Sequence, residues 1–525
     1  MHIGLLFYTD SLVLQNQTQK LNGRGMANLG FLKALLQYKA EHSVSLLVSG
    51  HWEKQIVQEQ VFSPHQNSCP IITFSELSKF LKEKPLQALH YPSPDLYRAF
   101  EIKKLNPTPM AVTGVTHSLG SAPFLEWLYL SLLASPQATD ALICTSPAAV
   151  KVLRKLQSEI THAFDLNPLA TPQIPLAIHC ADFQKTPAHN LYPEFPQEEF
   201  VLLYLGRISL FTKCDLKPLL IVFRELIKRS PKKSRLILAG ACEEEAYLED
   251  LSAYSHSLGI NSQISFKKNP SEELKKSLLQ RAQVFLAPND NPQETFGLSI
   301  LEALASGLPI VAADWNGYKS LIENEKEGFL IPTLIPSHLD FMGETAALQI
   351  DAMNHLYFSQ STATDLEIFT EKILSLITNE ELRQDMARQA RQKSSAYDWS
   401  QVIPQYLDLW ENLSQQNIPV KNKSTGAVKE RLYTLNYHQI FSHYATQVLT
   451  EEDSFQISPL GQEALQGNIP LENPPSLDEF LPVDAVLQVL QMGGKGFRVA
   501  DLSSISQGEF ILMWLYKYGF VKRVS

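Results

Sequence analysis

A pattern that occurs twice, with a proline-rich break between its two copies, constrains the fold of this 525-residue chain more than any other feature. In the first copy, short apolar segments alternate with stretches in which apolar residues recur at three- and four-residue spacing, as in residues 26–40. This alternation is typical of βαβ units and predicts a parallel sheet covered by helices. The strands predicted in this copy lie at residues 2–8, 43–50, 111–117 and 141–146.

The second copy follows residues 184–199, a polar stretch that contains Pro187, Pro193 and Pro196. Proline-rich polar sequence is typical of a connector between domains. We therefore predict an α/β protein with two Rossmann-like parallel-sheet domains facing a cleft, where ligands bind at the carboxyl ends of the strands. The strands predicted in the second copy lie at residues 200–207, 234–240, 263–268, 283–288 and 308–314.

The last hundred residues differ in kind, because they are mostly helical in pattern and show no strand–helix alternation. We expect a helix that stops at Gly519 and then a short strand, an ending that resembles a winged-helix fold. The predicted order is an N-terminal domain (1–183), a hinge (184–199), a second domain (200–395), a terminal helix returning to the first domain (396–413), a linker (414–427) and a small, mainly helical accessory domain (428–525).

Charge argues against nucleic acid as a partner. The whole chain has a formal net charge of −10, and residues 429–525 carry seven Lys and Arg against eleven Asp and Glu. A nucleic-acid-binding domain needs a basic surface. We expect the accessory domain to pack on the catalytic core or to dock a protein.

Composition indicates a folded protein, with 44% hydrophobic and 19% charged residues. The five scattered cysteines include no CxxC pair, which favours reduced thiols over a disulfide framework or a zinc site. No apolar stretch reaches the ~18 residues of a membrane-spanning helix, and the first residues resemble a buried strand more than a signal peptide. The expected location is the cytoplasm.

Residues 292–314 carry the most chemistry. Glu294 is expected in a loop after a strand, Gly297 at the start of a helix, and Glu302 inside that helix. The backbone N–H groups of Phe296, Gly297 and Leu298 would then point out of the helix start. A helix start of this kind favours a phosphate through hydrogen bonds and the helix dipole.

The two flanking carboxylates suggest what accompanies the phosphate. Each would repel a bare phosphate but would accept hydrogen bonds from hydroxyls, which are strong when the acceptor is ionised. A ligand with hydroxyls on both sides of a diphosphate is a nucleotide sugar. Arg207 and Lys213 follow the first strand of the second copy, and their charges suit a diphosphate leaving group.

The motifs GR-x5-K (Gly206, Arg207, Lys213) and E-x7-E (Glu294, Glu302) resemble those of GT-B-fold retaining glycosyltransferases of the family 4 type. Weaker similarity extends from residue 1 to about residue 413, including VTHS at His117. The resemblance implies transfer of a hexose-type sugar from a nucleotide-diphosphate sugar, with UDP sugars favoured. It also implies retention of anomeric configuration, a front-face mechanism, and neither a metal nor a resident cofactor.

The resemblance also implies roles for individual residues. Arg207 and Lys213 would stabilise the departing diphosphate, Glu294 would hold donor-sugar hydroxyls, and Glu302 would hold the ribose. The amides of Phe296, Gly297 and Leu298 would contact the sugar or phosphate, and His117 would touch the donor sugar from the opposite domain. Gly23 and Gly25 follow an insertion where the family often has a Gly-Gly phosphate loop. The acceptor stays open between a glycan, a small molecule, a lipid and a protein.

Plainer interpretations stand beside these. Glu294 alone would suit a helix N-terminus, Lys213 alone a solvated surface, and His117 alone a buried strand end. Gly23 and Gly25 would equally suit a turn. At the level of the whole protein, the alternatives are a nucleotide-sugar epimerase or hydrolase on the same scaffold and a non-catalytic adaptor that binds a partner through its C-terminal domain.

Overall fold

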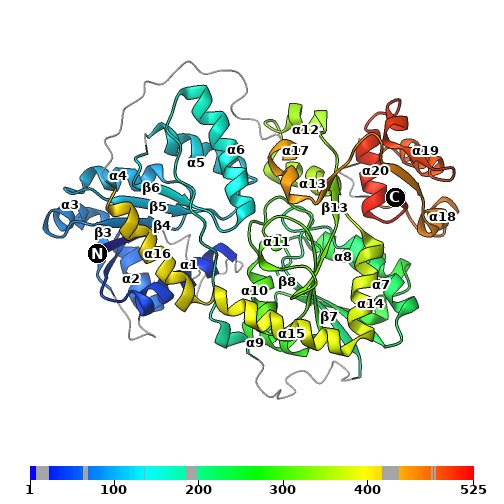
Figure 1. Ribbon diagram of the computed structural model, residues 1–525, viewed down its shortest axis with the longest axis horizontal. Coiled ribbons are helices and arrows are strands. Elements are labelled where there is room, and N and C mark those ends of the chain that lie inside the picture. Colours follow the sequence, from blue (N-terminus) through cyan, green and yellow to red (C-terminus); the bar gives the residue numbers. More distant parts are fainter. Residues whose placement is uncertain are drawn as a thin grey trace. The chain divides into compact units, whose positions relative to one another are not determined.

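The computed structural model (Figure 1) describes residues 1–7, 23–62, 69–134, 136–184, 198–416, 437–473, 477 and 480–524. The chain divides into two compact units. Unit 1 comprises Met1–Cys180 and Ser395–Thr434, and unit 2 comprises Ala181–Ser394 and Leu435–Ser525. Each unit contains one six-stranded sheet, so the predicted pair of parallel-sheet domains is confirmed.

The sheet of unit 1 has the strand order β3-β2-β1-β4-β5-β6, and every neighbouring pair is parallel. Its strands are short and largely buried, because helices on a parallel sheet cover both faces. The strands listed above as predicted include four of them and omit β3 and β4. The strands are β1 (His2–Leu6), β2 (Ser43–Val48), β3 (Ile71–Thr73), β4 (Ala88–Tyr91), β5 (Ala111–Val115) and β6 (Asp140–Ile143).

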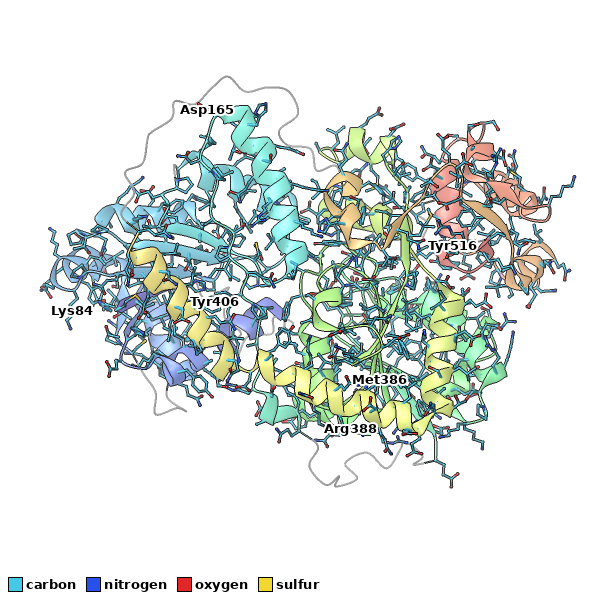
Figure 2. The ribbon with its side chains drawn as sticks, in the orientation of Figure 1. Lys84, Asp165, Met386, Arg388, Tyr406 and Tyr516 are labelled. Atoms are coloured by element: carbon cyan, nitrogen blue, oxygen red, sulfur yellow. The ribbon has the colours of Figure 1, made fainter. Side chains whose placement is uncertain are left out.

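A helix from late in the chain completes unit 1. This helix, α16 (Trp399–Ser414), packs on α1 (Gly23–Tyr38), and its Trp410 donates a hydrogen bond of 2.8 Å to the Thr113 hydroxyl of β5. Tyr406 of the same helix, labelled in Figure 2, packs on Phe31. The remaining helices of unit 1 are α2 (His51–Ile56), the π-helix η2 (Val57–Phe62), α3 (Phe74–Glu83), α4 (Tyr97–Leu105), α5 (Ala122–Leu133) and α6 (Pro147–Phe164).

The sheet of unit 2 has the order β12-β11-β10-β7-β8-β9 and is also parallel throughout. Its two central strands, β10 and β7, are neighbours, so the loops that follow them leave the same edge of the sheet. All five strands predicted in this half are present, and β12 was missed. The strands are β7 (Phe200–Leu205), β8 (Ser234–Gly240), β9 (Ile264–Lys268), β10 (Val284–Ala287), β11 (Ile310–Ala313) and β12 (Gly328–Ile331).

Helices connect these strands as the alternation predicts. The longest, α15, packs on α10 and buries Met386, which Figure 2 labels. The helices of this part are α7 (Lys217–Arg229), α8 (Glu245–Ser257), α9 (Glu272–Arg281), α10 (Leu298–Ala305), α11 (Tyr318–Leu321), α12 (Asp340–Thr345), α13 (Asp351–Gln360), α14 (Leu366–Thr378) and α15 (Glu380–Ser394).

Residues 437–524, called the C-terminal module below, form helices around a three-stranded antiparallel sheet of order β17-β16-β18. The expected ending is present, because α20 is followed by Gly519 at φ +76° and then by β18. The elements are α17 (Tyr437–Phe441), β15 (Gln447–Val448), β16 (Ser454–Ile457), α18 (Pro459–Leu465), α19 (Val483–Met492), β17 (Phe497–Arg498), α20 (Gly508–Lys517) and β18 (Val521–Val524).

The C-terminal module belongs to unit 2 by its contacts. Residues 333–364, which are additional to the repeating pattern, form part of this attachment. Their strand β13 (Thr333–Ile335) pairs with β14 (Ala363–Thr364) on one side and with β15 of the module on the other. Of the two predicted connectors, residues 185–197 and 417–427 lie outside the described residues.

Candidate active site

Two loops at the carboxyl edge of the unit 2 sheet meet at one ion pair. The loop after β7 carries Lys213, and the loop after the neighbouring strand β10 carries Glu294. Lys213 Nζ lies 2.6 Å from Glu294 Oε2 and donates a second bond, of 3.2 Å, to the Tyr318 hydroxyl. The structure therefore brings together residues of two motifs that are 81 positions apart.

Both members of this pair are charged at neutral pH. Burial opposes the charge of Lys213, but Glu294 outweighs burial and raises the Lys213 pKa above its ordinary value. Burial likewise opposes the charge of Glu294, but Lys213 holds the Glu294 pKa below its ordinary value. The side chain of Glu294 is 23% exposed and that of Lys213 is 9% exposed. Since a carboxylate has about four lone-pair sites, Glu294 retains capacity for a ligand hydroxyl.

The guanidinium of Arg207 links three loops. It donates 2.9 Å bonds to both the hydroxyl and the carbonyl of Thr212 and a 3.0 Å bond to Gln293 Oε1, and it lies 3.4 Å from Glu243 Oε1. Burial raises the pKa of Glu243, but hydrogen bonds from Thr212 and Arg207 outweigh burial and lower it. Arg207 is thus held in place at the same sheet edge while 36% of its side chain stays exposed.

The second carboxylate of the E-x7-E motif has its own lysine. Lys275 of α9 lies 2.7 Å from Glu302 Oε1 of α10, and its other partner is Glu272 at 3.2 Å. Burial raises the pKa of Glu302, and the attraction of Lys275 does not fully offset that rise. Glu302 is therefore a poorly solvated carboxylate that is ion-paired with Lys275.

The start of α10 requires a glycine. Gly297 is the N-cap residue, at φ +115°, and a Cβ there would lie 2.6 Å from the ring of Tyr318. Both conditions exclude larger residues. The prediction placed Gly297 at the helix start, and the first helical residue is Leu298.

The backbone N–H of Phe296 has a different partner from the one that the sequence predicts. We expected it to point out of the helix start with the amides of Gly297 and Leu298, but it donates to Glu294 Oε1 at 3.3 Å. One carboxylate oxygen of Glu294 therefore faces Lys213, and the other faces the backbone of its own loop.

Three of the predicted residues lie in unit 1. His117 follows β5, and its Nε2 lies 3.1 Å from the Pro92 carbonyl, to which the ring N–H donates. Gly23 begins α1, and Gly25 is buried two residues further along the helix. His117 also lines a small pocket of about 10 Å³ together with Asn28 of α1 and Trp399 of α16.

His90 of β4 is a core residue. It is 1% exposed, its Nδ1 lies 3.0 Å from the Thr113 hydroxyl, and burial lowers its pKa to about 3. All five cysteines have free thiols, as predicted.

Several residues at the site were missed by the sequence analysis. Tyr318 contacts Lys213, and Lys275 contacts Glu302. Arg207 is contacted by Gln293 and Glu243. Glu243 follows β8 by three positions, so the rule that ligands bind beyond strand ends could have found it. Lys275 lies inside a polar helix, and nothing in the sequence distinguishes it from its neighbours.

Two further features of the described residues concern metals and membranes. No three His, Cys, Asp or Glu side chains there are grouped so that they could hold a metal ion. None of the described helices combines the length and the apolar character that crossing a membrane requires.

Comparison with known proteins finds similarity over the part of the chain that holds the unit 2 residues described above. Residues 192–338 match the family described as glycosyl transferases group 1. A phosphatidyl-myo-inositol mannosyltransferase of Mycolicibacterium smegmatis is 25% identical over 251 residues, which cover 47% of this chain and 54% of that protein. The chain therefore spans about half the length of this curated relative.

Solved structures share the fold. A glycosyltransferase from Rickettsia africae superposes with a TM-score of 0.54 at 13% identity, covering 79% of this chain and 99% of its own. The Anabaena protein HepE in complex with UDP has a TM-score of 0.52 at 17% identity, covering 78% and 100%. The fold is that of GT-B glycosyltransferases, and residues 192–338 are similar to the glycosyl transferases group 1 family.

Proposed function

We propose that the protein is a retaining glycosyltransferase that moves a hexose-type sugar from a nucleotide-diphosphate sugar to an acceptor. The observation that carries the proposal is the meeting of Lys213, Glu294 and Arg207 at one edge of the unit 2 sheet. The group 1 match over this part of the chain supports it. UDP sugars are the favoured donors, since HepE was solved in complex with UDP.

The two cations suit the leaving diphosphate. Arg207 is fixed by Thr212 and Gln293 before any ligand arrives, so it needs no rearrangement to meet a developing negative charge. Preorganised charges of this kind are among the strongest contributions to catalysis. Lys213 keeps its charge because Glu294 lies beside it.

The carboxylates suit hydroxyls on either side of the diphosphate. Glu294 would accept hydrogen bonds from the transferred sugar, and Glu302 would accept them from the ribose. Burial deprives the Glu302 carboxylate of water and raises its pKa. A ribose hydroxyl would supply the hydrogen bond that water does not. The amides of Gly297 and Leu298 would contact the phosphate or the sugar, and the Phe296 amide would do so after leaving Glu294.

The proposed transfer is a front-face displacement. The bond between the anomeric carbon and the phosphate oxygen breaks, and the acceptor oxygen bonds to the same face of that carbon. The acceptor proton passes to the leaving phosphate oxygen, so no strong protein base is required. The reaction needs no metal or resident cofactor in this proposal, because Arg207 and Lys213 supply the positive charge.

The remaining predicted residues belong to the other side of the reaction. His117 would contact the donor sugar from unit 1, and Gly23 and Gly25 would allow close approach of a ligand to α1. The acceptor is a glycan, a small molecule, a lipid or a protein. The relative's name makes inositol lipids the first acceptors to test.

A thermal-shift panel of nucleotide sugars tests the donor. It compares UDP-glucose, UDP-galactose, UDP-N-acetylglucosamine, GDP-mannose and ADP-glucose on the wild type, on Arg207→Ala and on Arg229→Ala. Arg229, the last residue of α7, is a matched control for Arg207. Its side chain is about as exposed as that of Arg207, and it pairs with Glu371 of α14. A donor at 100 times its Kd stabilises by ~2.7 kcal/mol, which corresponds to a shift of roughly 5–11 °C.

The proposal predicts that one donor shifts the wild type and Arg229→Ala but not Arg207→Ala. No shift with any donor would contradict it and favour the adaptor. Product analysis then separates the enzymes. A transferase consumes the donor only with an acceptor, an epimerase converts the donor without one, and a hydrolase releases free sugar.

A further inference from the structure

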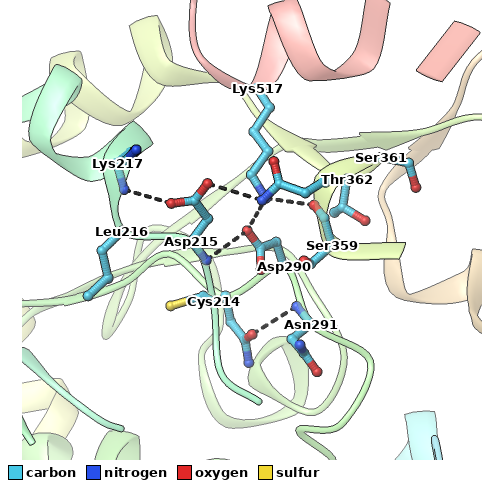
Figure 3. A network of polar contacts seen from close by, with 12 residues as sticks. Cys214, Asp215, Leu216, Lys217, Asp290, Asn291, Ser359, Ser361, Thr362 and Lys517 are labelled. Atoms are coloured by element: carbon cyan, nitrogen blue, oxygen red, sulfur yellow. Dashed lines mark hydrogen bonds and ion pairs between the residues drawn. The ribbon is translucent and has the colours of Figure 1, made fainter. Parts of the chain in front are cut away.

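The last helix of the chain enters the interior of unit 2. Eight of the ten residues of α20 are buried. At its end, Lys517 and the following Tyr518 are 2% and 1% exposed. A lysine buried to this degree needs a specific partner. Figure 3 shows the polar network into which the Lys517 side chain extends.

Two aspartates face these side chains. Lys517 Nζ pairs with Asp290 and donates a 2.6 Å bond to the Ser359 carbonyl. The Tyr518 hydroxyl donates to Asp215. The Asp215 amide in turn donates to Asp290 Oδ2 at 3.3 Å, so the two aspartates are themselves adjacent.

These aspartates belong to the two loops of the candidate active site. Asp215 lies two residues after Lys213 in the loop that follows β7. Asp290 lies four residues before Glu294 in the loop that follows β10. The two loops are therefore joined by Lys213 and Glu294 and also by the contact of Asp215 with Asp290. Figure 3 shows the second contact, with the Lys517 ammonium beside it.

Asp290 depends on Lys517 more than on any other group. Its Oδ1 atom is buried without a hydrogen-bond partner among the described residues. The nearby Lys217 is engaged elsewhere, because its ammonium pairs with Asp250 at 2.8 Å and Glu472 at 3.5 Å. Removing one partner of a buried ion pair leaves an uncompensated charge, which displaces its surroundings.

We propose that Lys517 is a positioning residue for the donor site, acting through Asp290 and Asp215 to fix the loops that carry Glu294 and Lys213. The inference rests on the proposed function for its catalytic meaning. It gives the C-terminal module a role in the activity of residues 192–338, because the module supplies the charge that the two loops lack.

A second ion pair offers a matched control. Arg224 of α7 pairs with Glu463 of α18 at 3.0 Å, so it also joins the C-terminal module to the rest of unit 2. It contacts neither site loop. Loss of Arg224 tests attachment alone, and loss of Lys517 tests attachment together with loop position.

Calorimetric titration of UDP into the full chain measures the difference. Displacement of a binding group by about 1 Å can cost ~10²-fold. We expect Lys517→Met to weaken UDP binding at least ~10-fold and Arg224→Met to leave it within about twofold of the wild type. Equal affinities in the wild type and Lys517→Met, or equal losses in the two variants, would overturn the inference.

Two additions keep the test decisive. If Lys517→Met does not fold, the comparison is made in Lys517→Met/Asp290→Asn, which removes the uncompensated carboxylate; affinity equal to the wild type in that variant would overturn the inference. If the wild type does not bind UDP, the proposed function fails, and hydrogen exchange then decides the inference. We expect Lys517→Met to accelerate exchange in residues 207–215 and 289–297, and acceleration confined to residues 437–524 would overturn it.

Discussion

Two lysine–carboxylate pairs hold the site loops of unit 2: one joins the two loops to each other, and the other joins the loop after β10 to α20. They differ in what surrounds them. In the pair of Lys213 and Glu294, the carboxylate side chain is 23% exposed. In the pair of Lys517 and Asp290, the two side chains are 2% and 5% exposed. A pair that keeps an accessible side can exchange a protein contact for a ligand, whereas a closed pair can only fix the chain around it.

The sequence context of the two pairs differs in the same way. Lys213 and Glu294 belong to recognisable motifs of one domain, whereas Lys517 comes from a helix 227 positions beyond Asp290. Under the proposed function, chemistry and loop position are divided between two parts of the chain. The following predictions test that division.

The largest expected effect is on turnover, when the accessible pair of Lys213 and Glu294 is changed. Glu294→Gln removes the charge that faces the donor but preserves the size of the side chain, so turnover of the donor identified above should fall ~10²–10³-fold. Release of the nucleoside diphosphate measures it. The matched control is Glu371→Gln, which removes an exposed carboxylate and should retain wild-type turnover. Equal turnover in Glu294→Gln and the wild type would remove Glu294 from the site.

The next largest effect is expected on the free energy of unfolding, when the buried pair of Lys517 and Asp290 is changed. Lys517→Met leaves the buried Asp290 carboxyl without its cationic partner, so the free energy of unfolding should fall by ~3–5 kcal/mol. Lys517→Met/Asp290→Asn should lose less, because it removes the stranded charge. Chemical denaturation measures both variants. A double variant less stable than Lys517→Met would show that the two residues do not act as a pair.

Acidity should distinguish the two carboxylates. Burial raises the pKa of Asp290 from 3.8 to about 6, against the opposing effect of Lys517, with Asp215 and the Cys214 thiol also nearby. The folded state then keeps a proton that the unfolded state loses, so the contribution of Asp290 to stability falls as pH rises from about 4 to about 6. The pKa of Glu294 is below its ordinary 4.5, so its contribution is present above that value and is lost as pH falls further.

The measurement is the free energy of unfolding against pH for the wild type, Asp290→Asn and Glu294→Gln. The difference between the wild type and Asp290→Asn should decrease with pH across that window. The difference between the wild type and Glu294→Gln should rise with pH up to about 4.5 and then stay level. If the two differences changed with pH in the same direction, the predicted contrast between Asp290 and Glu294 would be wrong.

The smallest effect is expected at the surface. Arg229 and Glu371 form an exposed pair, and exposed pairs contribute ~0–1 kcal/mol. Arg229→Ala should therefore change the free energy of unfolding by less than ~1 kcal/mol. A loss as large as that of Lys517→Met would mean that burial does not separate the pairs.

The sequence predicted the fold to the extent that the fold is periodic. Buried parallel strands such as β7 and β8 form continuous apolar runs, and the prediction found them. β3, with three residues, and β12, interrupted by Gly328 at its start, are too short to register as runs.

The site was predictable where its residues share a short motif. Glu294, Gly297 and Glu302 lie within nine positions, so their spacing on one loop and helix could be read directly. The contacts of Lys275 with Glu302 and of Lys517 with Asp290 arise only when distant elements pack, and no local pattern marks either lysine. For the same reason, the sequence alone does not show that eight of the ten residues of α20 are buried.

The most direct test of the central claim is hydrogen exchange of the full chain with and without saturating UDP. The account predicts protection in residues 206–215 and 289–298, which contain Arg207, Lys213 and Glu294, and none in those segments of Arg207→Ala at the same UDP concentration. Protection of the wild type only elsewhere in the chain would contradict the placement of the site.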